Sequence, residues 1–290
     1  MCFFVHLFSR QANHADADGF AKRSRYIVKF FLIAGLLLSS TVAGLAAGWQ
    51  STITRDPPGS FPEPRPLRAI YNFGWSGITA ATAEARFNKS PENRFQLDAT
   101  GRTIGLARAL WRYDVDFHAV SDARTLRPIE TSQNEIIRTK KLSTHLAFST
   151  AGVTRSRTEN GNPVKGKSFA FSNLYDLQSA MLYLRSEPLK DRSSYRVAVY
   201  PTTSPYLATV TVTGHEKMNV RAGSYNAIKM DLQLSKIGQS FELQPHRKFR
   251  KATIWISDDP DRVILRVEAQ IFVGTIFAEL QSVKFETPKS

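Results

Sequence analysis

The sequence predicts a mainly β protein: a strongly curved antiparallel sheet, or half-barrel, of about ten strands wrapped around one main helix. A transmembrane or signal helix is expected in front of this domain. Three features indicate the fold: apolar and polar residues alternate along most of residues 67–286, one segment at 174–186 has helical spacing, and an uncharged apolar run ends at Gly48. A sheet of this size with one wet face must curl, and a helix inside the curl buries its apolar face.

The residues before Trp49 predict export through a membrane. Residues 1–25 form a basic segment, and residues 26–48 contain an uncharged run from Phe30 to Gly48 that is long enough to span a bilayer core. The basic side is expected in the cytoplasm. The small residues Ala43, Gly44, Ala46 and Ala47 also resemble a signal-peptidase site. Two locations therefore stay open: an inner-membrane anchor with the main domain in the periplasm, or a periplasmic protein after signal cleavage.

Residues 49–66 predict an extended linker, because five of them are proline. The globular part is expected to start near Leu67 and to run to residue 286 as a single domain, since no repeat or second change in composition follows. A chain that begins at Leu67 is therefore expected to fold by itself.

The strands follow from runs in which apolar and polar residues alternate with a period of two. Five runs show it most clearly, at residues 69–75, 113–119, 142–148, 228–234 and 263–271. Sequences typical of turns lie between the runs: Ser121-Asp122, Asn160-Gly161-Asn162-Pro163, Ala222-Gly223 and Ser257-Asp258-Asp259-Pro260. Each run predicts a strand with one buried and one wet face.

One segment breaks the alternation and predicts the main helix at residues 174–186. Asn173 is suited to cap its first turn. The apolar face of the helix is expected to hold Leu174, Leu177, Met181 and Leu184. Ser179 falls on a side expected to be less buried. A second, shorter helical turn is predicted at 104–110, although Gly105 disfavours it.

Composition and charge narrow the function classes. With 42% hydrophobic residues the chain is too apolar for a wholly disordered protein, and its single cysteine excludes a disulfide framework or a thiolate metal cage. Lys and Arg number 39 against 25 Asp and Glu, for a net charge of +14. On an exported domain this charge suits an anionic membrane surface or another envelope component. The basic residues are scattered and no recognition helix accompanies them, so nucleic acid is not an expected partner.

Three short motifs within residues 67–285 carry a resemblance to a known family. They are Tyr71-x-x-x-Trp75-x-Gly77-Ile78, Asp176-Leu177-x-Ser179-Ala180-x-x-Tyr183-x-Arg185 and Trp255-Ile256-Ser257-Asp258-Asp259. In this order they resemble the bacterial family called domain of unknown function 3108. The resemblance implies an exported envelope protein whose half-barrel is related to the lipoprotein carriers of the periplasm, and it brings no activity or functional residues. The chain departs from those carriers because its only cysteine, Cys2, precedes the apolar run and cannot carry a lipid after it.

The sequence offers few groups for catalysis. Asp114, Asp116 and His118 share one face of an expected strand, where solvent exposure explains them better than a metal site. The carboxylates at 258–261 are typical of a turn rather than a calcium loop. A Gly-x-Ser-x-Gly motif and glycine-rich phosphate loops are absent from the sequence. No enzymatic activity, cofactor or metal ion is therefore expected.

Large aromatic residues occupy positions that are expected to face inward. They are Trp75, Trp111, Phe117, Phe148, Tyr183 and Trp255. They either fill a solid core or line a cavity for an apolar ligand such as an acyl chain. A solid core predicts a structural or assembly factor of the envelope that binds a protein or glycan. A cavity predicts a non-enzymatic binding or carrier module for a lipid, lipoprotein or other amphiphile; this is the favoured hypothesis, with the six aromatic residues as the ligand-binding site.

Overall fold

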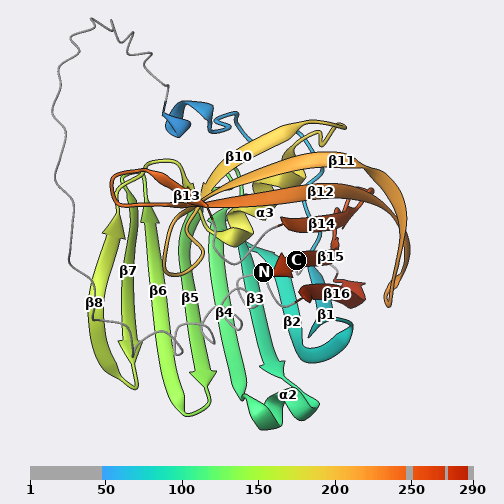
Figure 1. Cartoon of the computed structure of the whole chain (residues 1–290). Helices are drawn as coiled ribbons and strands as arrows, with labels where there is room; N and C mark the ends of the chain where they lie inside the picture. The colour runs from blue at the N-terminus through green and yellow to red at the C-terminus, as the bar shows by residue number, and fades with distance from the viewer. Residues whose placement is uncertain (1–47, 246–250, 272–273, 287–290) are drawn as a thin grey trace, which may run out of the picture.

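A computed structural model describes residues 48–245, 251–271 and 274–286. Their sixteen strands form one curved, open sheet with few helices (Figure 1). The mainly β fold and the curved sheet are confirmed, whereas the expected number of about ten strands is wrong. The predicted helix at 26–48 lies outside the described residues except for Gly48. Within the described ranges, no helix combines the length and apolarity needed to cross a bilayer.

The strands divide into two halves of the sheet. The first half comprises β1 (Leu67–Trp75), β2 (Ile78–Ser90), β3 (Arg94–Thr103), β4 (Tyr113–Asp122), β5 (Pro128–Ile137), β6 (Lys140–Ser149), β7 (Gly152–Glu159) and β8 (Asn162–Phe169). The second half comprises β9 (Leu174–Tyr175), β10 (Ser194–Val199), β11 (Tyr206–Val220), β12 (Gly223–Ile237), β13 (Leu243–Pro245), β14 (Lys251–Ser257), β15 (Ile264–Ile271) and β16 (Gly274–Phe285). The helices are η2 (Trp49–Thr52), α2 (Gly105–Leu110) and α3 (Leu177–Ser186).

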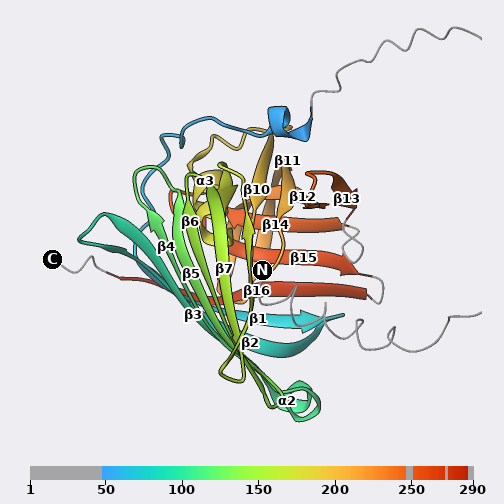
Figure 2. The same ribbon diagram turned by 90° about the vertical axis from the view of Figure 1, so that its left-hand side faces the viewer.

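The sheet runs in the order β8-β7-β6-β5-β4-β3-β2-β1-β16-β15-β14-β12-β11-β10-β9, with β13 paired to β12. Neighbours are antiparallel except for the short β9, which is parallel to β10. Two views at right angles show the halves turned toward each other with α3 between them (Figures 1 and 2). Side chains close the curl: Leu146 and Val153 of the first half pack with Ala198, Leu207 and Ile237 of the second.

The sequence does not predict strands β5 and β8, because apolar and polar residues do not alternate along them. β5 contains the run Thr131-Ser132-Gln133-Asn134-Glu135, which is polar on both faces, although Thr131, Gln133 and Glu135 are buried. In β8 every residue from Asn162 to Ser168 is exposed. Backbone pairing with a neighbouring strand, not a hydrophobic pattern, makes these segments strands.

α3 begins three residues later than predicted. Leu174 and Tyr175 pair with β10 as β9, so Asn173 is not the cap. Asp176 is the N-cap residue instead, and its carboxylate accepts a hydrogen bond from the Ser179 amide at 2.6 Å. The expected burial of the helix was also wrong, because Ser179 is 0% exposed whereas Met181 is only partly buried. The Ser179 hydroxyl meets that of Ser121 on β4 at 2.9 Å, which ties this side of α3 to the sheet.

The other end of α3 is held by the turn between β14 and β15. Arg262, 4% exposed, donates through one guanidinium nitrogen to the carbonyls of Arg185 and Glu187, both at 2.5 Å. Arg185 in turn donates to the carbonyl of Asp261. Asp259 shapes the turn by accepting hydrogen bonds from the amides of Asp261 and Arg262. The aspartates at 258–261 therefore form a structural turn, as the sequence predicted, and its arginine binds helix carbonyls.

The proline-rich segment 49–66 is extended beyond η2 but lies against the domain. Ile53 is buried in the cluster that closes the curl. Thr54 and Arg196 exchange hydrogen bonds at 2.9 Å through the Thr54 amide and hydroxyl. Arg65 pairs with Asp261 at 2.5 Å. Because these contacts bury an isoleucine and add to a sheet edge, this extended segment also contributes to the core, which its sequence did not predict.

Removal of residues 1–66 is consequently predicted to destabilise the domain compared with removal of residues 1–48. The shorter chain loses Ile53, and replacement of a buried isoleucine by alanine typically costs about 2–5 kcal/mol. Urea unfolding of the two chains measures the difference, and Ile53→Ala in the longer chain should reproduce most of it. Equal unfolding free energies would show that the segment adds nothing to the core.

Candidate functional site

The concave face of β4–β7 carries an unusual number of buried polar side chains. Strand register places Phe117, Gln133, Thr144 and Arg157 in one row across the four strands. The adjacent row contains Ala119, Thr131, Leu146 and Arg155. Gln133, Thr144, Thr131 and Arg155 are all buried. Apolar and polar groups thus share one enclosed face, which we call the concave face below.

Two polar atoms on this face have no hydrogen-bond partner within the described part of the chain. They are the Thr144 hydroxyl and the Arg155 Nε. Gln178 of α3 is 6% exposed, and both its amide oxygen and nitrogen also lack a partner there. Burial of a polar group without a hydrogen bond costs about 1–3 kcal/mol. This cost marks the concave face as a place where a polar ligand group would be stabilised.

Other polar groups of the concave face are satisfied internally. The Tyr113 hydroxyl donates to Glu135 at 2.7 Å, and the Thr131 hydroxyl donates to Asp176 at 2.9 Å. The first bond lies beside the two rows, between β4 and β5, and the second joins one row to the N-cap of α3.

Three of the six predicted aromatic residues lie on or beside the concave face. Phe117 and Phe148 have the same strand parity as the buried Val115 and Leu146, and both are half-buried. Trp111 packs against the cluster of Tyr113, Val115, Ile137 and Leu142. The structure therefore brings Trp111, Phe117 and Phe148 to one surface.

The other three aromatic residues lie elsewhere. Tyr183 is fully buried in the main core, with its ring 5.5 Å from that of Tyr175. Trp75 ends β1 and is 39% exposed. Trp255 was expected to face inward, but its neighbours Ile254 and Ile256 pack in the core with α3. Its indole donates to Glu216 at 2.6 Å on the opposite side of the sheet.

Side chains on the predicted polar face of β4 form ion pairs with neighbouring residues. Asp114 pairs with Arg108 and Arg112, and His118 lies 2.7 Å from Asp98. Among the residues that the structure describes, no three His, Cys, Asp or Glu side chains are grouped to hold a metal ion.

Comparison with known families identifies the chain. The model of a family described as "protein of unknown function (DUF3108)" matches residues 69–281, nearly the whole sheet. The chain belongs to this family. A search of curated proteins gives no match to this DUF3108 chain.

One solved structure similar to the DUF3108 chain supports its fold. A β-barrel-like protein with the domain of unknown function DUF1849 from Brucella abortus has a TM-score of 0.57 and 11% sequence identity, over 78% of this chain and 100% of the other. A candidate lipoprotein of Parabacteroides distasonis reaches a TM-score of only 0.32 at 9% identity, over 79% of this chain and 100% of the other. At such identities the first likeness shows the fold alone.

Sequence reasoning missed the polar rows of the DUF3108 domain. The run Thr131–Glu135 contains no apolar residue, so nothing distinguishes its inner face from its outer face. A usable signal was the length of this polar run between two alternating strands, because a central strand of a curled sheet must bury one face.

The buried N-cap of α3 has a measurable electrostatic consequence. Burial raises the pKa of the Asp176 carboxyl, although hydrogen bonds from Ser179 and Thr131 oppose the shift. Because the pKa is higher in the folded chain, the contribution of Asp176 to stability is complete below its unfolded pKa of about 3.9 and is lost as the pH rises through the folded value.

Asp176→Asn is therefore predicted to raise the melting temperature at neutral pH. Asparagine keeps a side-chain oxygen for the Ser179 amide and removes the buried charge. The gain over the natural chain should shrink as the pH falls toward about 4, where the carboxyl is protonated. Thermal unfolding followed over this pH range checks the prediction; a difference that is independent of pH would contradict it.

Proposed function

We propose that this DUF3108 domain is a non-catalytic binding or carrier module for an amphiphilic ligand, such as a lipid or an acylated chain, in the bacterial cell envelope. The observation that carries the proposal is the concave face, where buried polar atoms without partners lie beside apolar side chains. An amphiphile presents the same two chemistries to such a surface.

The arrangement of the concave face supports this choice of ligand. Arg155 and Thr144 offer donors to an anionic or hydroxylated headgroup. Leu142, Leu146 and Phe148 lie along β6 on the same face; the two leucines are packed in the core, and the half-buried Phe148 offers apolar contact to a chain. Each buried methylene group of the ligand contributes about 0.8 kcal/mol.

The expected location supports the same proposal. The apolar run that ends at Gly48 and the basic residues before it are typical of a protein whose main domain is delivered to the periplasm. A domain there is surrounded by membrane lipids and acylated proteins. The envelope location is part of the proposal.

A specific observation favours the second candidate, an assembly factor that binds a protein. β8 pairs on one side only, with β7, among the described strands, and its residues 162–168 are exposed. An extended segment of another protein could pair with such an edge. Pro163, Lys165 and Lys167 oppose this pairing, because proline and lysine are typical of protected edge strands.

Extraction of the chain purified from cells, followed by mass spectrometry, tests the proposal. We expect one amphiphilic molecule to be retained per chain. Titration with fatty acids, lysophospholipids and an acylated peptide should then change the tryptophan emission, because Trp111 borders the concave face.

Arg155→Met is the matched variant, with Arg124→Met in the exposed β4–β5 turn as its control. Loss of a charged hydrogen bond costs about 1.5–3 kcal/mol, so Arg155→Met should weaken binding about tenfold or more while the control leaves it unchanged. Absence of a retained ligand together with an unchanged emission in every titration would favour the assembly factor.

A further inference from the structure

The helix α2 exposes apolar side chains at one end of the domain. Leu106 is 76% exposed and Leu110 is 70% exposed, and their spacing of four residues places them on one side of the helix. Ile78, at the start of β2, is 66% exposed. The amide of Ile104 donates to the carbonyl of Ala80, so this part of β2 lies beside α2. We call Ile78, Leu106 and Leu110 the apolar tip.

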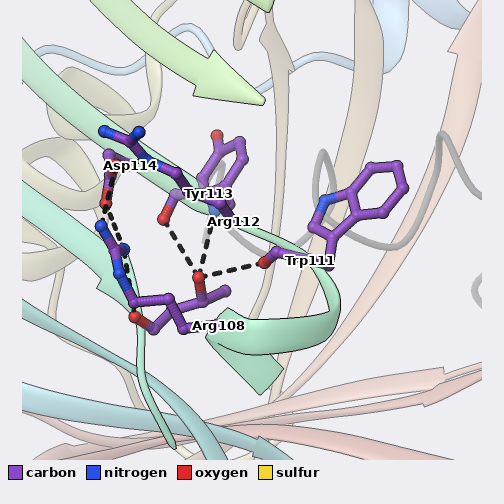
Figure 3. A network of polar contacts seen from close by, with 6 residues as sticks. Arg108, Trp111, Arg112, Tyr113 and Asp114 are labelled. Atoms are coloured by element: carbon purple, nitrogen blue, oxygen red, sulfur yellow. Dashed lines mark hydrogen bonds and ion pairs between the residues drawn. The ribbon is translucent and has the colours of Figure 1, made fainter. Parts of the chain in front are cut away.

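The chain holds α2 in place. Asp114 accepts hydrogen bonds from Arg108 at 2.5 Å and from Arg112 at 2.8 Å. The Thr103 hydroxyl donates to the carbonyl of Trp111 at 3.1 Å and accepts from the amide of Tyr113 at 3.0 Å. Figure 3 shows Asp114 and the indole of Trp111 on opposite sides of this turn. The leucines are therefore presented by a bonded turn, so their exposure does not come from a loose loop.

Gly105 makes this turn possible. It begins α2 with φ of 52°, in the left-handed region that a side chain disfavours. The residue that weakened the helix prediction is thus the one that lets the chain leave β3 and enter α2.

Cationic side chains surround the apolar tip. Strand register and the β5–β6 turn bring six of them to this end of β3–β6: Arg102, Arg108, Arg112, Arg138, Lys140 and Lys141. The two carboxylates that pair with members of this set are Asp114 and Glu159. Six positive and two negative charges leave an excess of four positive charges. Arg138 also lies over the Trp111 ring, 4.2 Å from its centroid.

The apolar tip lies at the opposite end of the domain from η2, where the chain enters. Both views place α2 and η2 at opposite ends (Figures 1 and 2). The tip is thus not covered by the segment 49–66, which packs near the other end.

We propose that the apolar tip and its cationic surround are a docking surface for an anionic lipid membrane. Leucines at one side of a short helix with arginines around them match the two layers of a membrane interface, the acyl boundary and the headgroups. The half-buried Trp111 matches the headgroup level, where tryptophan is enriched. The proposal does not depend on the ligand of the concave face.

A fluorescent label at the tip tests the proposal on the full chain held in amphipol. Leu106→Cys, with Cys2→Ser, receives an environment-sensitive NBD group, and phosphatidylcholine vesicles with or without phosphatidylglycerol are added. We expect the emission to rise about twofold or more and to shift to the blue with the anionic vesicles, since position 106 would reach the acyl boundary. A label at Ser143→Cys, exposed on the outer face of β6, should change far less.

A pair of arginine variants tests the charge. Arg102→Gln lies at the tip end of β3, and Arg94→Gln lies at the other end of the same strand. Removal of one cation near a lipid surface costs about 1 kcal/mol, so Arg102→Gln should weaken vesicle binding about fivefold and Arg94→Gln should not. Unchanged melting temperatures show that both variants fold.

Three results would overturn the proposal. Equal responses of the labels at 106 and 143 would show that the apolar tip does not enter the membrane. Equal responses at 106 to vesicles with and without phosphatidylglycerol would remove the role of the cations. A blue shift that grows with protein concentration before vesicles are added would show that a second copy of the chain covers the tip.

Discussion

The rest of the structure depends on placing a short helix inside a curled sheet. A helix end leaves backbone groups without partners, and inside a protein these must be satisfied by other side chains. Asp176 does this at the start of α3, and Arg262 does it at the end through two carbonyls. Asp176 is bonded to Thr131 of the first half of the sheet, whereas Arg262 belongs to the turn between β14 and β15 in the second half. The two ends of one helix thereby hold the two halves at a fixed separation.

These bonds at the two ends of α3 explain why the polar side chains of the concave face stay buried. A flatter sheet would expose Gln133, Thr144 and Arg155 to water. Their polar groups would then form hydrogen bonds with water and would pay no desolvation penalty. Because α3 fixes the curl, these side chains stay buried, and part of the stability gained from the apolar clusters offsets their desolvation. Polar groups kept inside at such a cost are typical of a functional surface, since an apolar residue of the same size would stabilise the fold more.

Local signals predicted the parts of this fold that local chemistry determines. The Asn160–Gly161 turn forms with φ of 51° and 84°, as expected for these residues between two strands. The other features of the fold depend on contacts between residues that are distant in sequence. Leu174 and Tyr175 lie outside the helix because they pair with β10 as the short strand β9. Trp255 is also buried, at 7% exposed, but it packs in a different cluster from Ile254 and Ile256, on the opposite face of the sheet. Because all three residues are apolar, alternation alone does not tell which face lies toward α3. Leu106 and Leu110 have helical spacing that resembles a core stripe, and only the three-dimensional structure shows that nothing in the described chain covers them.

Trp111 connects the two surfaces for which a role is proposed. Its ring packs with Tyr113, Val115, Ile137 and Leu142, which form the end of the concave face. Its backbone carbonyl accepts the Thr103 hydrogen bond that holds the last turn of α2, and Arg138 covers its ring. A displacement of α2 therefore either shifts the indole of Trp111 or breaks the hydrogen bond from Thr103. Since the indole borders the concave face, a contact made at the apolar tip and a ligand held on the concave face share one residue. A chain of packed side chains is one physical route by which two sites are coupled, and between these two surfaces that chain consists of a single residue.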